Sequence, residues 1–162
     1  MSIATKITNR GLRKLRLLWY KKKLNARDKN LMIFGKVIIK DTANIRIGNN
    51  CRFNDYVFLH GGGGLVIDDD VTISAFSKIL TLSYNTDDWE SNYKSKEHIG
   101  KKVYIGPGAW IGADCTILPG VELNGKGIIV AAGSVVNKSF NEDFILIGGN
   151  PAKILKRYSQ ER

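Results

Sequence analysis

Aliphatic residues recur at every sixth position between residues 105 and 135, at Ile105, Ile111, Ile117, Leu123, Ile129 and Val135. A spacing of six does not match the 3.6-residue period of an α-helix. It is a multiple of the two-residue period of a strand, so each aliphatic residue can point inward from a short strand. Glycines and prolines fall between these positions, where sharp corners need small or φ-restricted residues. The pattern predicts a parallel β-helix with three short strands per coil and one continuous aliphatic column.

The same period begins near residue 37 and is interrupted twice. It holds from 47 to 59, fails in the run His-Gly-Gly-Gly-Gly at 60–64, and resumes from 67 to 79. Residues 80–104 then break it completely, and so long an excursion is uncommon in a compact domain unless it has a function. Both interruptions follow the third strand of a coil, so we expect them to stack at one corner. That corner would collect both histidines of the chain and several polar and aromatic residues, namely His60, His98, Tyr84, Asp87, Asp88, Trp89 and Tyr93.

The N-terminal segment mixes basic and apolar residues. Residues 1–29 carry ten lysines and arginines against one acid, Asp28, and apolar residues fall at helical spacing, at Leu12, Leu15, Leu18 and Trp19. This spacing predicts an amphipathic helix over 11–23 with a basic face. The helix could cap the open end of the β-helix with its lysines in water, or rest on anionic lipid with Trp19 and Tyr20 at the apolar boundary. Because no recognisable nucleic-acid-binding motif accompanies the charge, we expect no nucleic-acid partner.

Composition limits the remaining possibilities. The chain has 162 residues, 43% of them hydrophobic, and a formal charge of +10, which indicates one globular domain. It contains no apolar run long enough to span a bilayer and no signal-peptide core, so we expect a cytoplasmic protein or one at the inner face of the membrane. Cys51 and Cys115 lack metal-ligand or redox spacing and are expected to be packing thiols. The acidic run at 68–70 lacks the glycine and distal glutamate of a calcium loop, so no metal is expected.

Several segments resemble the hexapeptide-repeat acyltransferases. They are 103–112 (VYIGPGAWIG), 117–121 (ILPGV), 132–136 (AGSVV) with Lys138, and 149–154 (GNPAKI). Within that family the chain is similar, over residues 37–157, to the sugar O-acetyltransferases of the maltose, galactoside and capsule or O-antigen kind. The resemblance implies a left-handed β-helix, an exception to the usual right-handed crossover. It also implies a homotrimer whose acetyl-CoA sites lie in clefts between neighbouring subunits.

Acetyl transfer to a sugar hydroxyl needs a base that takes the hydroxyl proton, and histidine has an unperturbed pKa near neutrality. The resembled family carries this histidine where the long loop leaves the coil, in a segment like Thr-x-x-His, and the matching residue here is Tyr84. Three accounts remain open. His98 on the returning limb can take the place, His60 at the same corner can act instead, or no histidine acts and the cleft works by orientation alone or has lost activity. We favour His98, with Asp87 or Asp88 orienting its imidazole.

The resemblance also assigns a coenzyme path. It implies that the pantetheine and adenine are lined by Trp110, Ala113, Ala132, Asn137 and Lys138, and that Lys153 and Lys156 meet the coenzyme phosphates. Small residues let a thin pantetheine chain lie close to the backbone, and lysines supply point charges for phosphate. The acceptor would lie against Tyr84, Asp87, Asp88 and Trp89.

The predicted organisation is an all-β protein in three parts: a basic N-terminal helical cap (1–36), the β-helix (37–147) with the protruding loop 80–104, and a C-terminal turn, short helix and tail (148–162). The end segments would cover the open ends of the coil. The expected function is acetyl-CoA-dependent O-acetylation of a sugar hydroxyl in the biosynthesis of a surface polysaccharide such as capsule or O-antigen. The alternatives are an N-acetyltransferase acting on an amino-sugar nucleotide and a catalytically impaired trimeric scaffold.

Overall fold

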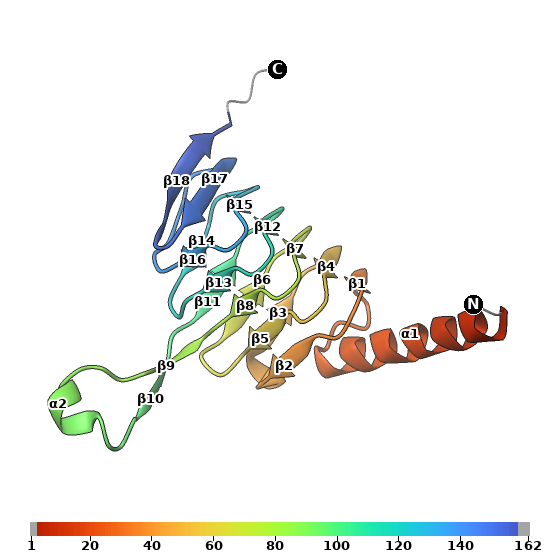
Figure 1. Ribbon diagram of the computed structural model, residues 1–162, viewed down its shortest axis with the longest axis horizontal. Coiled ribbons are helices and arrows are strands. Elements are labelled where there is room, and N and C mark those ends of the chain that lie inside the picture. Colours follow the sequence, from red (N-terminus) through yellow and green to blue (C-terminus); the bar gives the residue numbers. More distant parts are fainter. Residues whose placement is uncertain (1–2, 159–162) are drawn as a thin grey trace.

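The computed structural model describes residues 3–158, and the side chains of all of these except residues 3–10 and 13. Most of the chain winds into a stack of coils, as Figure 1 shows. Three sheets of short parallel strands form the faces of a prism. This arrangement confirms the predicted β-helix.

Each of the first four coils contributes one strand to each sheet. Sheet A contains β1 (Leu31–Ile33), β4 (Cys51–Phe53), β7 (Thr72–Ile73), β12 (Trp110–Ile111), β15 (Ile129–Val130), β17 (Ile145–Gly149) and β18 (Ala152–Arg157). Sheet B contains β2 (Ile38–Lys40), β5 (Phe58–His60), β8 (Lys78–Ile79), β13 (Thr116–Ile117) and β16 (Val135–Val136). Sheet C contains β3 (Ile45–Ile47), β6 (Leu65–Ile67), β11 (Val103–Ile105) and β14 (Glu122–Leu123). We name the edges where the chain turns between faces the A–B, B–C and C–A edges.

The inward column is aliphatic apart from Phe53, and from Ile105 onward it changes phase once. Ile105, Ile111, Ile117 and Leu123 are fully buried, as predicted. The next inward residues are Val130 and Val136, whereas the predicted Ile129 and Val135 are partly exposed on the outer faces. The C–A corner after Leu123 is one residue longer than the corner in the preceding coil. Four residues separate Leu123 from the buried Ile128, whereas three separate Ile105 from the equivalent Ala109. In a strand a shift of one residue exchanges the two faces.

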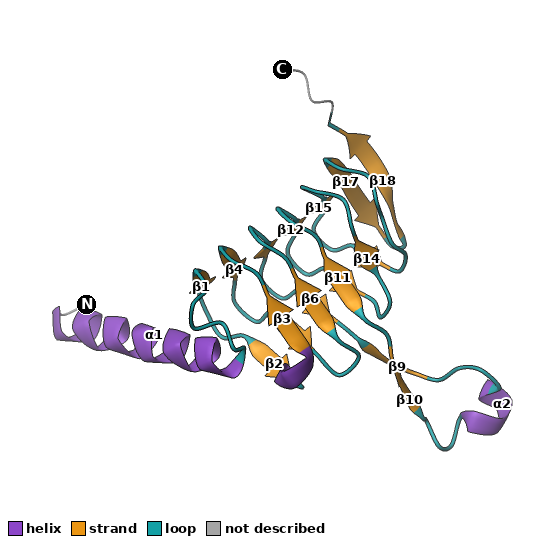
Figure 2. Cartoon of the chain, turned by 180° about the vertical axis from the view of Figure 1, so that it is seen from behind, coloured by secondary structure: helices purple, strands orange, loops and turns teal. Residues whose placement is uncertain are grey.

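The N-terminal helix, α1 (Ile3–Lys23), begins earlier than predicted and only its last turn covers the end of the β-helix. Tyr20 and Leu24 are buried there. The Tyr20 hydroxyl donates to the carbonyl oxygen of Val37 at 2.8 Å and accepts from the Val37 amide at 2.9 Å. The rest of α1 points away from the stack, as both views show (Figures 1 and 2).

The predicted C-terminal helix is wrong. After the turn at 149–151 the chain forms β18, which pairs antiparallel with β17. Sheet A would otherwise end on unpaired backbone groups, and β18 satisfies them while burying Ala152.

A short 3₁₀-helix, η1 (Thr42–Asn44), follows β2. Over the described part of the chain, no helix is long and apolar enough to cross a membrane. Within residues 3–158, no group of three or more histidine, cysteine and acidic residues is arranged to hold a metal ion.

Candidate active site

The 80–104 excursion is a hairpin that leaves the prism at the B–C edge. Its strands β9 (Leu82–Tyr84) and β10 (His98–Gly100) pair antiparallel, and α2 (Trp89–Asn92) lies near the tip (Figure 2). At its root the Thr81 hydroxyl donates to the carbonyl oxygen of His60 at 2.7 Å and accepts from the Gly63 amide at 2.9 Å. These contacts confirm that the two interruptions of the period stack at one corner.

Two glycines are required where the returning limb of the hairpin passes close to the preceding coil. A Cβ on Gly63 would fall against the carbonyl oxygen of Thr81, and a Cβ on Gly100 would lie 2.8 Å from the Cα of Gly63. Only a residue without a side chain lets the returning limb of the hairpin pass this close to the preceding coil. Glycine at 63 and 100 therefore fixes where the hairpin stands.

His60 lies at this edge with both ring nitrogens engaged. Its side chain is only 16% exposed, and its Nε2 lies 3.4 Å from a carboxylate oxygen of Asp41. The Nδ1 accepts a hydrogen bond from the Gly62 amide at 3.2 Å. An Nδ1 that accepts leaves the proton of a neutral imidazole on Nε2, facing Asp41. The geometry thus makes His60 a residue that holds the corner together.

His98 has the opposite surroundings. It sits on β10 directly across from Tyr84, and the two ring centroids are 4.6 Å apart. Both residues are exposed, and among the described residues no hydrogen bond or ion pair occupies a nitrogen of His98. The expected convergence of the two hairpin limbs is therefore observed, and it places the His98 imidazole beside Tyr84, the residue that the sequence resemblance matched to the family's histidine.

Asp87, Asp88 and Trp89 lie further out, around the tip of the hairpin. The Asp87 amide is bonded to the side chain of Asn85, and its carbonyl oxygen accepts from Asn92. In the described structure neither acid is bonded to His98. Their proposed orienting and acceptor-binding roles stay predictions.

Three of the predicted coenzyme residues gather at the A–B edge. Ala113 and Ala132 occupy the same corner in successive coils, since the Gly133 amide donates to the carbonyl oxygen of Ala113 at 2.8 Å. Trp110 lies on the outer face of sheet A just before this corner, and its indole donates to Ser74 at 3.1 Å. The corner is a ledge of small residues with an exposed indole beside it.

The remaining predicted coenzyme residues lie at two other places. Asn137 and Lys138 follow β16 and so belong to the B–C edge, where the Lys138 ammonium lies 5.5 Å from the ring of Phe140. Lys153 and Lys156 are exposed on β18, with Lys156 over the ring of Tyr158 at 4.6 Å. One chain therefore distributes the predicted coenzyme residues among three places, which are the A–B edge, the B–C edge and strand β18 of sheet A.

Comparison with known proteins agrees with this geometry. No protein-family model matches the chain. The chain is 33% identical over 126 residues to the Escherichia coli protein WbbJ, which is named as a lipopolysaccharide biosynthesis O-acetyl transferase; the match spans 72% of this chain and 62% of that protein. The structure of a hexapeptide-repeat acetyltransferase from Vibrio cholerae, complexed with acetyl coenzyme A, superposes with a TM-score of 0.66 and 28% identity, covering 82% of this chain and 73% of that one. The chain belongs to the hexapeptide-repeat acyltransferase family.

Family members of more than one chemistry share this fold. AntD, an N-acyltransferase from Bacillus cereus whose structure contains dTDP and 3-hydroxybutyryl-CoA, superposes with a TM-score of 0.65 and 25% identity, covering 82% of each chain. This hexapeptide-repeat chain spans less than two thirds of the length of the curated relatives it matches first.

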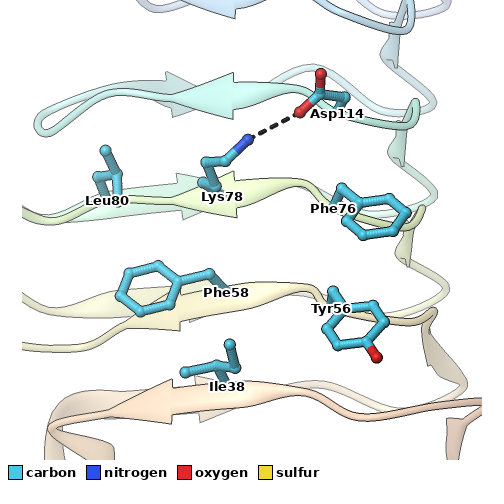
Figure 3. A pocket seen from close by; sticks show the side chains of 7 residues that line it. All are labelled: Ile38, Tyr56, Phe58, Phe76, Lys78, Leu80 and Asp114. Atoms are coloured by element: carbon cyan, nitrogen blue, oxygen red, sulfur yellow. Dashed lines mark hydrogen bonds and ion pairs between the residues drawn. The ribbon is translucent and has the colours of Figure 1, made fainter.

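Sheet B carries a groove that the sequence pattern did not reveal. Figure 3 shows the side chains that line this hollow of about 610 Å³, which are Ile38, Tyr56, Phe58, Phe76, Lys78, Leu80 and Asp114. The rings of Tyr56 and Phe76 stack at 5.3 Å, and Lys78 is paired with Asp114 at 2.8 Å. The apolar residues of this groove occupy outward and corner positions, which the period of six inward residues does not include.

A second, polar hollow of about 450 Å³ lies on the other side of the hairpin root, on sheet C. It is bordered by Arg46, Lys102 and the backbone of the glycine run. No sequence pattern indicates this hollow, because Arg46 and Lys102 are 56 residues apart and only the stacking of the coils brings them together.

Proposed function

We propose that this protein transfers the acetyl group of acetyl-CoA to a hydroxyl group of a saccharide, in the biosynthesis of a surface polysaccharide. The observation that carries the proposal is the exposed imidazole of His98 beside Tyr84, on the hairpin at the B–C edge where the resemblance leads us to expect the catalytic histidine. Family membership supports the acyl donor, because the Vibrio cholerae relative binds acetyl coenzyme A. The similarity to WbbJ supports a saccharide acceptor.

In the proposed reaction His98 accepts the proton of the acceptor hydroxyl as its oxygen attacks the thioester carbonyl. A carbon–oxygen bond forms, and the carbon–sulfur bond breaks when the tetrahedral intermediate collapses. The proton held by His98 then passes to the departing thiolate, so the histidine returns to its starting state. Tyr84 packs against the imidazole and limits the orientations it can take.

We propose that the site is completed in a homotrimer. His98 stands at the B–C edge while Ala113 and Ala132 form the ledge at the A–B edge, and sheet B separates the two. A threefold ring that joins the B–C edge of one subunit to the A–B edge of the next brings the two sets together and turns sheet B toward the axis. The apolar groove on that sheet supports this arrangement, since it would be covered there.

A second candidate is transfer to an amino group of a sugar nucleotide. It rests on the likeness to AntD, which covers as much of this chain as the likeness to the Vibrio cholerae acetyltransferase. The same histidine would then take a proton from the attacking amine.

Thiol release from acetyl-CoA, measured with hydroxyl and amino sugars as acceptors, tests these proposals. We expect release that depends on a hydroxyl acceptor, a fall in kcat of about 10²- to 10⁴-fold in His98→Ala, and retained activity in the matched variant His60→Ala. Loss in His60→Ala with retention in His98→Ala would transfer the role of base to His60. Release with amino sugars alone would favour the second candidate, and no acceptor-dependent release would favour a scaffold.

A further inference from the structure

The helix α1 exposes an apolar stripe that the β-helix does not cover. The part of the helix that precedes its last turn points away from the stack (Figure 1). Its exposed apolar side chains are Leu12 (64%), Leu15 (65%), Leu18 (62%) and Trp19 (53%). Large apolar side chains clustered in this way on a surface mark an interaction site.

The stripe and the packed side of α1 face different directions. At 100° per residue, Leu12, Leu15, Leu18 and Trp19 fall within one arc of about 120°. Tyr20 and Leu24, which are buried against the β-helix, lie outside that arc. Folding of the single chain therefore cannot bury the stripe.

Cations border the stripe. Lys14 is exposed beside the stripe and Lys22 is exposed at its C-terminal end, and the Lys23 ammonium lies 4.8 Å from the centre of the Trp19 ring. A hollow of about 320 Å³ between Leu18, Lys21, Lys22 and Arg27 joins an apolar wall to three positive side chains. In the sequence, the first acidic residue is Asp28.

We propose that α1 lies on the surface of an anionic phospholipid membrane, with Leu12, Leu15, Leu18 and Trp19 among the acyl chains and the lysines at the headgroup phosphates. Leucines, a tryptophan and flanking lysines on one helix are the composition of interfacial helices. The electrostatic attraction of each lysine or arginine to the anionic surface adds to the apolar burial.

The same side chains disfavour the other occupants. A bundle of α1 helices from several copies would bring segments with ten basic residues and one acid close together, and like charges repel. Nucleic acid would neutralise the cations but leave the four apolar side chains in water. A lipid surface satisfies both the charge and the apolar stripe.

Flotation of the full chain with vesicles tests the proposal independently of acetyl transfer. We expect the protein to float with vesicles of mixed phosphatidylcholine and phosphatidylserine, and at least about tenfold less of it to float with phosphatidylcholine alone. The triple variant L12S/L15S/L18S should bind the anionic vesicles at least about tenfold more weakly. The matched variant Leu155→Ser, exposed to a similar degree on β18, should bind like the wild type.

Circular dichroism of the folded variants guards against loss of structure. In a Trp89→Phe/Trp110→Phe background, Trp19 fluorescence should shift to the blue on addition of anionic vesicles. Three results would overturn the proposal: no flotation of the wild type, equal flotation of the leucine variant, or self-association through α1 that disappears in the leucine variant without any lipid binding. Capture of an acidic protein in place of vesicles would overturn it as well.

Discussion

The two cysteines illustrate how a coil position controls side-chain chemistry. Cys51 is fully buried, with its sulfur 3.1 Å from the carbonyl oxygen of Asp68. Burial raises the pKa of the Cys51 thiol to about 11 and also raises the pKa of Cys115. The sequence prediction that both are packing thiols agrees with this environment.

Thiol labelling as a function of pH checks this environment. In the folded protein we expect both cysteines to react with a disulfide reagent at pH 8 at least about a hundredfold more slowly than in the denatured chain, because the thiolate is the reacting form. Since the folded pKa of Cys51 lies above its ordinary value of 9.0, the protein should lose stability as pH rises from 9.0 toward about 11. Rapid native labelling of either thiol would contradict this expectation.

For the histidines, the sequence predicted the shared corner but not the partners of each ring. The period of six places His60 and His98 at one edge without any knowledge of side chains. It cannot show that Asp41, in the preceding coil, approaches His60, because η1 and the glycine run together set that distance. The partners decide which imidazole is free, so the choice between the two histidines needed the structure.

The hairpin is the element on which the proposed chemistry depends, and Gly63 sets its position. In Gly63→Ala the new Cβ would fall against the carbonyl oxygen of Thr81 and 2.6 Å from the Lys101 amide nitrogen, both of them backbone. We expect the free energy of unfolding to fall by about 1–3 kcal/mol. We also expect kcat to fall by about 10²-fold, because His98 is displaced. Urea unfolding and thiol release measure the two effects.

Gly11→Ala is the matched control. A Cβ at position 11 has open space around it, and alanine favours the helical state of α1 by about 0.5–1 kcal/mol. Stability should therefore stay the same or rise. If Gly63→Ala behaved like Gly11→Ala, the close crossing at the hairpin root would not be needed.

At the level of elements, the sequence succeeded where the repeat is strict and failed where it ends. The β-helix followed from the spacing alone, because each coil has the same environment as the one before it. The sequence predicts a helix for the C-terminal segment. In the structure this segment forms β18, because it pairs with the otherwise open edge of β17 in sheet A. The longer corner after Leu123 likewise shifted the inward residues to Val130 and Val136, which spacing by six could not anticipate.

The proposed trimer is tested at the scale of the whole molecule. Phe76 is 53% exposed on the sheet B side, so Phe76→Glu should place a charge in the apolar surface that the ring would bury. We expect light scattering to give a trimer for the wild type and a monomer for Phe76→Glu. Acetyl transfer should fall together with assembly.

Leu12→Glu serves as the control for this variant, because Leu12 is exposed on α1 and lies far from sheet B along the chain. It should remain trimeric. A trimer that survived Phe76→Glu, or a wild type that stayed monomeric, would argue against the inward placement of sheet B.

The stacking of the coils also sets the distance, along the axis of the β-helix, between the hairpin and the ledge of small residues. The hairpin leaves in the coil of β8, whereas Ala113 and Ala132 stand in the next two coils, and neighbouring strands are spaced by about 4.8 Å. The height between the histidine and the small-residue ledge can therefore change only in whole steps. A relative could have one coil more or one fewer between the hairpin and the ledge. The distance that the thioester-bearing arm of the coenzyme must span would then differ by one strand spacing, although every side chain at the site stayed the same.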